Sequence, residues 1–534
     1  MKTLCRGPRA AISPTRYAAL VLLMAPSLAL AQAATHSALA PLAAPADRGL
    51  TVLGFAGMVA RSDEVVRAQK LEEAIAEQGL RGAGAIYEPF FSTTVGRDGK
   101  FLPTTAEEYF QRGGSASGQG SPVPFEARIN QVKAAVGAKG STGADWEVSY
   151  NLDGIVNSLQ ARLGSGYISP EYRGSFGFSI SQPLMRNAGK EVTESGIRIA
   201  EREESIAKET VRQIMAQRLN EALQTYLFAQ RAQERVRWRE LALRLASQLE
   251  VEVSRQHEAG LKSRNELTEA RANLALRQAQ VAQAQQDLEE QLNALQVFLS
   301  ASPSTQETPS AQRWVPSEPL KLPPPEYSDS LRMTDTQTAF DRRPETRVNR
   351  LRIEREEYRR FAAKNQTEPE LNFKVRYGKE SLLDRATWFY NYLERGSPYN
   401  AWGVGLFFRI GIGGDIKKES EYQTAILRKS QAELSLGAAQ QRIVNELLGV
   451  KAVLDRAVQQ ANRQAEIVSA QEELLAAERR MVSEGQKSAL DILRREQEIT
   501  VSREALADAI VQVNRTSFIA SQANGGLLAR LGLE

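Results

Sequence analysis

The sequence has 534 residues and is nearly free of the side chains that most often carry enzyme chemistry. It contains one cysteine, Cys5, and two histidines, His36 and His257. A single cysteine excludes an internal disulfide. No group of His, Asp and Glu has metal-ligand spacing, and no serine lies in a nucleophile-elbow context. We therefore expect no catalytic residue, no metal site, no cofactor and no enzyme activity.

Long apolar runs are also scarce. Residues 1–31 combine four basic residues, an apolar stretch over 17–30 and small residues at 29–33, which is typical of a secretory signal peptide. About 14 apolar residues are too few to span a bilayer. Beyond this segment there is no run of 18 apolar residues, which argues against helical membrane spans.

The chain also lacks a large net charge of either sign. The chain has 68 basic and 64 acidic residues, a formal charge of +4. The signal segment contains basic residues at positions 2, 6, 9 and 16 and no acidic ones, so the remainder is close to neutral. The charge balance gives no support to nucleic-acid binding, and we expect no nucleic acid partner.

What the sequence does contain is a duplication. The segments "EAGLKSRNEL" (258–267) and "SEGQKSALDI" (483–492) share a Gly-x-Lys-Ser phrase, 225 positions apart (485 − 260). Downstream of each, apolar residues recur every seven positions, which is typical of a coiled-coil seam. Corresponding members of the two series are again 225 positions apart: Leu267, Leu274, Val281, Leu288 and Leu295, then Ile492, Ile499, Leu506, Val513 and Ala520.

The duplication predicts the domain organisation. Upstream of each glycine, Ala188–Ala259 and Asp415–Glu484 are predicted to be helices, each roughly 100 Å long. Gly260 and Gly485 would then end one helix and begin the turn into the next. We expect a first repeat at 32–300, a linker at 301–335 that contains seven prolines, and a second repeat at 336–534.

Strands are predicted between the helical blocks, because apolar and small or polar residues alternate there. Such segments fit transmembrane barrel strands, but an ordinary sheet with one wet face has the same pattern. An aromatic cluster beside them, which includes Tyr399 and Trp402, favours the barrel. The predicted strands are Tyr87–Val95, Trp146–Leu152, Ser175–Ser181, Leu371–Tyr377 and Trp402–Ile412, with a loop over Phe101–Pro124.

The duplicated order of strands, long helix, glycine turn and heptad helix resembles the TolC-like outer membrane factor family. The stretches that carry the resemblance are "FGFSISQPLMRNAGK" (176–190), "EAGLKSRNELTEARANL" (258–274), "RRPETRVNR" (342–350), "PELNFKVRYG" (369–378) and "SEGQKSALDILRREQ" (483–497). The chain departs from the family at Arg409-Ile410-Gly411, where a proline corner is expected, and in an insertion over 99–160 with an extra hairpin around Asn130–Asp153.

The resemblance implies a mixed α and β fold: a trimer whose copies share one transmembrane β-barrel and one α-helical coiled-coil tunnel. It also implies an outer membrane location, with the helices in the periplasm, and a periplasmic adaptor and an inner-membrane pump as partners. The implied function is the channel of a tripartite efflux system. The exit duct of a type I protein secretion system remains an alternative. A periplasmic adaptor or coiled-coil scaffold is a further one, although an adaptor needs only one hairpin.

The same resemblance implies roles for the two glycine turns. The adaptor would dock at Gly260, Leu261, Lys262 and Ser263 and at Gly485, Gln486, Lys487 and Ser488. A gate that closes the tunnel would use Lys487 with the acidic residues Glu266 and Asp491. Two positions depart from the family's gate: Val482, where a tyrosine is expected, and Arg494, where an acid is expected.

Overall fold

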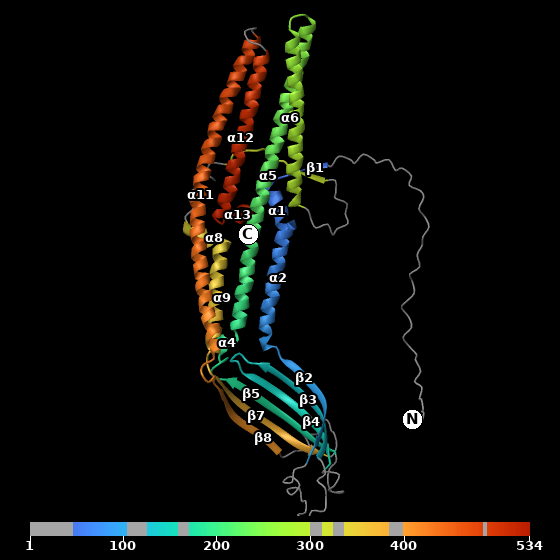
Figure 1. Cartoon of the computed structure of the whole chain (residues 1–534), viewed down its shortest axis with the longest axis vertical. Coiled ribbons are helices and arrows are strands. Elements are labelled where there is room, and N and C mark those ends of the chain that lie inside the picture. The colour runs from blue at the N-terminus through green and yellow to red at the C-terminus, as the bar shows by residue number, and fades with distance from the viewer. Residues whose placement is uncertain are drawn as a thin grey trace, which may run out of the picture.

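The computed structural model describes residues 46–103, 125–158, 170–299, 312–323, 336–383, 399–483 and 489–533. The molecule is long and narrow, with a β-sheet at one end, a helical layer in the middle and two helical hairpins at the other end (Figure 1). The expected signal peptide and most of the proline-rich linker lie outside the described residues.

Two helices run almost the whole length of the helical part. They are α5 (Ser195–Glu258) and α11 (Ile416–Ser483), with 64 and 68 residues. At 1.5 Å per residue each is roughly 100 Å long. Each packs against a shorter returning helix, α6 (Arg264–Val297) or α12 (Ala489–Ala523). The predicted long helices and heptad helices are therefore confirmed.

The helices form an ordered layer. Near the sheet the order is α2 (Glu64–Gly84), α5, α9 (Pro344–Gln366), α11, and in the hairpins it is α6, α5, α12, α11 (Figure 1). A core that contains Phe55, Leu223, Tyr226 and Leu295 joins the two parts. The remaining short helices are α1 (Val52–Ser62), η1 (Ala85–Tyr87), α4 (Lys190–Thr193), α8 (Thr336–Arg342) and α13 (Leu527–Arg530).

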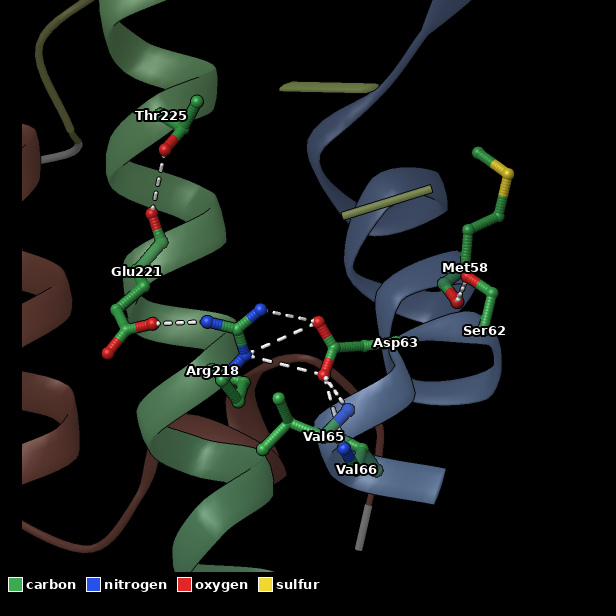
Figure 2. A network of polar contacts seen from close by, with 8 residues as sticks. All are labelled: Met58, Ser62, Asp63, Val65, Val66, Arg218, Glu221 and Thr225. Atoms are coloured by element: carbon green, nitrogen blue, oxygen red, sulfur yellow. Dashed lines mark hydrogen bonds and ion pairs between the residues drawn. The ribbon is translucent and has the colours of Figure 1, made fainter. Parts of the chain in front are cut away.

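One buried ion pair joins the N-terminal helices to α5. Asp63 lies between α1 and α2, and its carboxylate accepts hydrogen bonds from the backbone amides of Val65 and Val66, so it caps α2. Arg218 of α5 points at the same carboxylate, with 2.8 Å between Nη2 and Oδ2, and also contacts Glu221 (Figure 2). Because the Asp63 side chain is only 3% exposed, its charge depends on this arginine.

Six antiparallel strands form the sheet, in the order β2-β3-β4-β5-β7-β8. Their bounds are β2 (Phe90–Leu102), β3 (Phe125–Lys139), β4 (Asp145–Asn157), β5 (Glu171–Pro183), β7 (Glu370–Leu383) and β8 (Tyr399–Arg409). The extra hairpin expected around Asn130–Asp153 is confirmed as β3 and β4. The first repeat thus supplies four strands and the second repeat two.

All five strand predictions were wrong in their bounds. Three of them lie inside longer strands, β4, β5 and β7, and the other two are displaced along the chain. Tyr87 belongs to η1, and β2 continues past Val95 to Leu102, because pairing with β3 keeps a segment with two glycines extended. The last predicted strand ends at Arg409 rather than Ile412. Gly413 and Gly414 follow with φ of +91° and +87°, which turns the chain into α11.

A second, smaller sheet was not predicted. It pairs β1 (Ala46–Leu50) with β6 (Gln312–Pro316) in parallel. The β6 strand lies inside the proline-rich linker, and its position in a two-stranded sheet leaves Pro316 at an edge, where a missing amide proton is tolerated. The hydroxyl of the buried Tyr226 donates to the carbonyl of Leu50 at 2.7 Å, which holds β1 against α5.

Candidate channel wall and hairpin turns

One face of the six-stranded sheet has a central apolar zone that runs from edge to edge. Cross-strand partners place one residue of each strand in a single row: Phe91, Val136, Val148, Phe178, Tyr377 and Trp402. A neighbouring row contains Trp146, Ile180, Val375 and Val404. Many of these side chains are open to the surroundings, including Trp402 at 76% exposure and Val404 at 59%. Nothing in the described part of the chain covers this face.

Most residues of the opposite face are polar or small, with a few apolar ones such as Phe407. This face presents Ser149 and Asn151 on β4, Ser179 on β5 and Lys374 on β7, because successive side chains of a strand point to opposite sides. Several ions on this face are paired, such as Lys133 with Glu147 at 3.6 Å. Further pairs are Lys139 with Asp145 and Arg409 with Glu370. The sheet therefore has one largely apolar face and one largely polar face.

The sheet and the helical layer end at corresponding edges. Among the described residues, β2 and β8 each pair with a strand on one side only, and α2 and α11 are the outer helices of the layer beside the sheet. Both outer helices expose apolar side chains. On α2 these are Leu71 and Ile75. On α11 they are Leu427, Leu434 and Leu448, which are separated from one another by seven and fourteen positions.

The first hairpin turn lies at Gly260. Its φ of +75° is in the left-handed region, where glycine carries no steric cost, so the predicted helix end is confirmed. The following residue, Leu261, is 77% exposed. The ring of His257 makes a 2.9 Å hydrogen bond with the carbonyl of Lys262 across the turn. An apolar side chain thus protrudes at the far end of the molecule from a turn with a defined backbone.

Ser263 and Glu266 begin α6 with a capping box, which sequence reasoning missed. The Ser263 hydroxyl accepts from the Glu266 amide, and the Glu266 carboxylate accepts from the Ser263 amide at 2.9 Å. Lys262 Nζ lies 2.7 Å from the same carboxylate. The hydrogen bond from Lys262, followed by that from the Ser263 backbone, lowers the pKa of Glu266 to about 2. The signal was visible in the sequence as Ser-x-x-Glu.

The structure describes only some of the remaining residues that were predicted for the second turn and the gate. The turn 484–488, with Gly485, Gln486, Lys487 and Ser488, lies outside the described residues. Asp491 belongs to the first turn of α12, but its side chain is not among those described. Val482 is half-buried near the end of α11, and Arg494 is exposed. The structure therefore brings together Lys262, Ser263 and Glu266, and does not test the pairing of Glu266 with Lys487.

In the region between the hairpin turns and the apolar core around Tyr226, polar contacts connect the two hairpins. Arg239 of α5 pairs with Glu504 of α12, with 2.9 Å between Nη2 and Oε2. Arg277 of α6 is buried and donates to the side-chain oxygens of Gln280 and Gln497 at 3.0 and 2.9 Å. Burial, and then the charge of Arg239, lowers the pKa of Arg277. The hairpins thus meet through charged and amide groups, whereas nearer the sheet they share an apolar core.

In the described parts of the chain, no helix is both long and apolar enough to cross a membrane. The described residues also contain no group of three His, Cys, Asp or Glu side chains that could hold a metal ion.

No protein-family model and no curated protein matches the sequence. Solved structures match most of it. A membrane protein from Pseudomonas aeruginosa is 16% identical, with a TM-score of 0.60 over 89% of this chain and 90% of that one. CusC, studied for its transmembrane channel formation, is 15% identical, with a TM-score of 0.57 over 89% and 92%. The MtrE outer membrane channel of Neisseria gonorrhoeae is 13% identical, with a TM-score of 0.56 over 89% of both chains.

These similarities extend over about nine tenths of this chain. At such low identities they establish the architecture rather than any residue's role. The mixed α and β fold expected from the resemblance is confirmed, and the chain has the fold of TolC-like outer membrane channels.

Proposed function

We propose that this protein is the outer membrane channel of a tripartite efflux or export system. It would pass substrates from an inner-membrane pump through the periplasm to the outside. The observation that carries the proposal is the apolar face that crosses all six strands without interruption, opposite a polar face. Strands that are apolar outside and polar inside are the pattern of outer-membrane barrels.

An open sheet is not stable in lipid, because its edge carries unpaired backbone groups. The edges of β2 and β8 would therefore pair with other copies of the chain. The same head-to-tail contact would bring Leu71 and Ile75 of α2 against Leu427 and Leu434 of α11 in the next copy. A head-to-tail contact that closes makes a ring. Three copies of six strands would give an eighteen-stranded barrel, a size at which barrels contain an aqueous channel.

The hairpins would continue the ring into the periplasm. Their length of roughly 100 Å suits a tunnel that reaches toward the inner membrane, and the predicted signal peptide provides for export. On the turn side of the shared apolar core, the polar contacts between the hairpins suit a water-filled tunnel, because these groups can also bond to water.

The adaptor would dock at the two turns, with Leu261 as the apolar contact of the first. Leu261→Glu should abolish efflux and leave the oligomer in the membrane, because the side chain is exposed and supports no packing. Gly260→Asn is the matched control for the backbone, since asparagine tolerates positive φ. Loss of the oligomer in Leu261→Glu would contradict a docking role.

A gate at the turns would use Lys487 with Glu266 and Asp491. Lys487→Glu should raise conductance in planar bilayers. Because Glu266 also caps α6, the informative partner change is Glu266→Gln, which keeps a capping side chain and removes the charge. If both variants conduct like the parent, these charges do not close the tunnel.

The function itself is tested on the mature chain isolated from outer membranes. We expect an oligomer in unheated gel samples that becomes a monomer on boiling, and stable conductance in planar bilayers. Leu427→Glu with Leu434→Glu should prevent the oligomer, whereas Val501→Glu, at an exposed site of the inner helix α12, should not. A chain found only in the periplasmic fraction, without conductance, would instead indicate a coiled-coil scaffold. Export of a polypeptide in its presence would indicate a secretion duct.

A further inference from the structure

The polar face of the sheet carries two neighbouring cations of β7 that stand outside its ion pairs. Lys374 and Arg376 lie two positions apart on β7, so their side chains leave the sheet on the same side, about 7 Å apart along the strand. Neither forms an ion pair with a described carboxylate, whereas Lys133, Lys139 and Arg409 on the same face each do. Lys374 Nζ lies 5.4 Å from the ring centre of Phe407.

The neighbours of these cations leave room and offer further hydrogen bonds. On β5 the cross-strand partners are Ser181 and Ser179, and on β8 they are Gly405 and Gly403. The glycines have no side chains to fill the space, and the six residues line a hollow of about 420 Å³. Two cations and two hydroxyls around this hollow are suited to binding an anion. Lysine, arginine and serine side chains all donate hydrogen bonds to anionic oxygens.

We infer that Lys374 and Arg376, with Ser179 and Ser181, form an anion-binding patch on the channel wall. This inference rests on the proposed function, because the polar face lines a pore only in a closed ring. A ring of three copies would place six such cations around the channel. Two carboxylates lie four positions from the patch on the same face of β7: Glu370, which is paired with Arg409, and Glu380. The patch would favour solutes with carboxylate or phosphate groups and chloride over potassium, because fixed charges in a confined pore enrich counter-ions.

The test is the reversal potential of the reconstituted channel in a potassium chloride gradient. The parent should prefer chloride, and Lys374→Gln with Arg376→Gln should lower the chloride-to-potassium permeability ratio by roughly threefold or more. Lys379→Gln is the matched control. It removes the same charge from the same strand on the opposite face, where its partner is Phe176, and should leave the ratio unchanged.

A second variant keeps both cations. Ser179→Glu places a carboxylate directly across from Arg376 and should lower the ratio in the same direction. All variants are first checked for the heat-sensitive oligomer. A conducting channel whose ratio is the same in the parent and both patch variants overturns the inference, as does an equal effect of Lys379→Gln. A parent that does not conduct at all refutes the proposed function instead.

Discussion

The sheet and the centre of the helical layer differ in where they place large apolar side chains. In the core of the helical layer Tyr226, Phe55 and Leu219 are fully buried. In the sheet Trp402, Leu406 and Val95 are between 69% and 76% exposed. Helices of a water-soluble part must bury an apolar stripe, whereas strands in contact with lipid turn apolar residues outward. Under the proposed function, one chain contains two regions built for different solvents, and its apolar content alone does not distinguish them.

Removing a buried charge partner in the helical region should have the largest effect. Asp63→Ala leaves Arg218 without its main partner and α2 without its cap, which should cost about 3–5 kcal/mol of stability. Thermal unfolding of the detergent-solubilised protein, followed by helical circular dichroism, would measure it. Glu221→Ala, on the exposed side of the same arginine, should cost less than about 1 kcal/mol. Equal effects would mean that the Asp63–Arg218 pair is not an anchor.

The two solvents can be compared directly with valines of similar exposure. Val404 of β8 is 59% exposed and Val501 of α12 is 56% exposed. Val404→Arg should cost about 2–4 kcal/mol, because it puts a charge midway along a strand on the apolar face. Val501→Arg should be nearly neutral. The readout is the fraction of chain that reaches the outer membrane as oligomer. Similar yields for the two variants would argue that the sheet does not face lipid.

The first hairpin turn gives a smaller effect. Ser263→Ala removes the hydroxyl that caps α6 and should cost about 1 kcal/mol locally. Hydrogen exchange at the amides of the first turn of α6 should become faster, while exchange in the sheet should not change. Ser263→Thr, which keeps the hydroxyl, is the control. Unchanged exchange in Ser263→Ala would show that Glu266 holds the turn without the serine.

The smallest effect is a response of this turn to acid. The folded pKa of Glu266, about 2, lies below its ordinary value of 4.5, so the carboxylate stabilises the turn fully above pH 4.5. That contribution is lost as the pH falls from 4.5 through 2. Pepsin cleavage beside the exposed Leu261 should therefore increase over this range beyond the protease's own pH dependence. Glu266→Gln should remove the excess. A parent and variant with the same profile would contradict the prediction.

Sequence periodicity was sufficient to locate the long helices and the strands β4, β5 and β7. Heptad spacing and alternation follow directly from helix and strand geometry. Periodicity failed for β2, whose glycine-containing half is extended only because β3 pairs with it. It could not identify the partner of Glu266 either. A carboxylate can pair with a lysine four positions away or with one on another hairpin, and the nearer Lys262 is the partner in this structure.

The parallel pairing of β1 with β6 has a consequence for the order in which the molecule forms. Ala46 and Gln312 are register partners although 266 positions separate them (312 − 46). Contacts between such distant residues form slowly, because a long loop must close first. In a chain delivered from its N-terminus, β1 has no partner until the linker has arrived. Once β6 has arrived, the pairing closes a loop that contains α5 and α6. The core around Tyr226 is complete only when Phe518 and Leu527 of the second repeat have also been delivered.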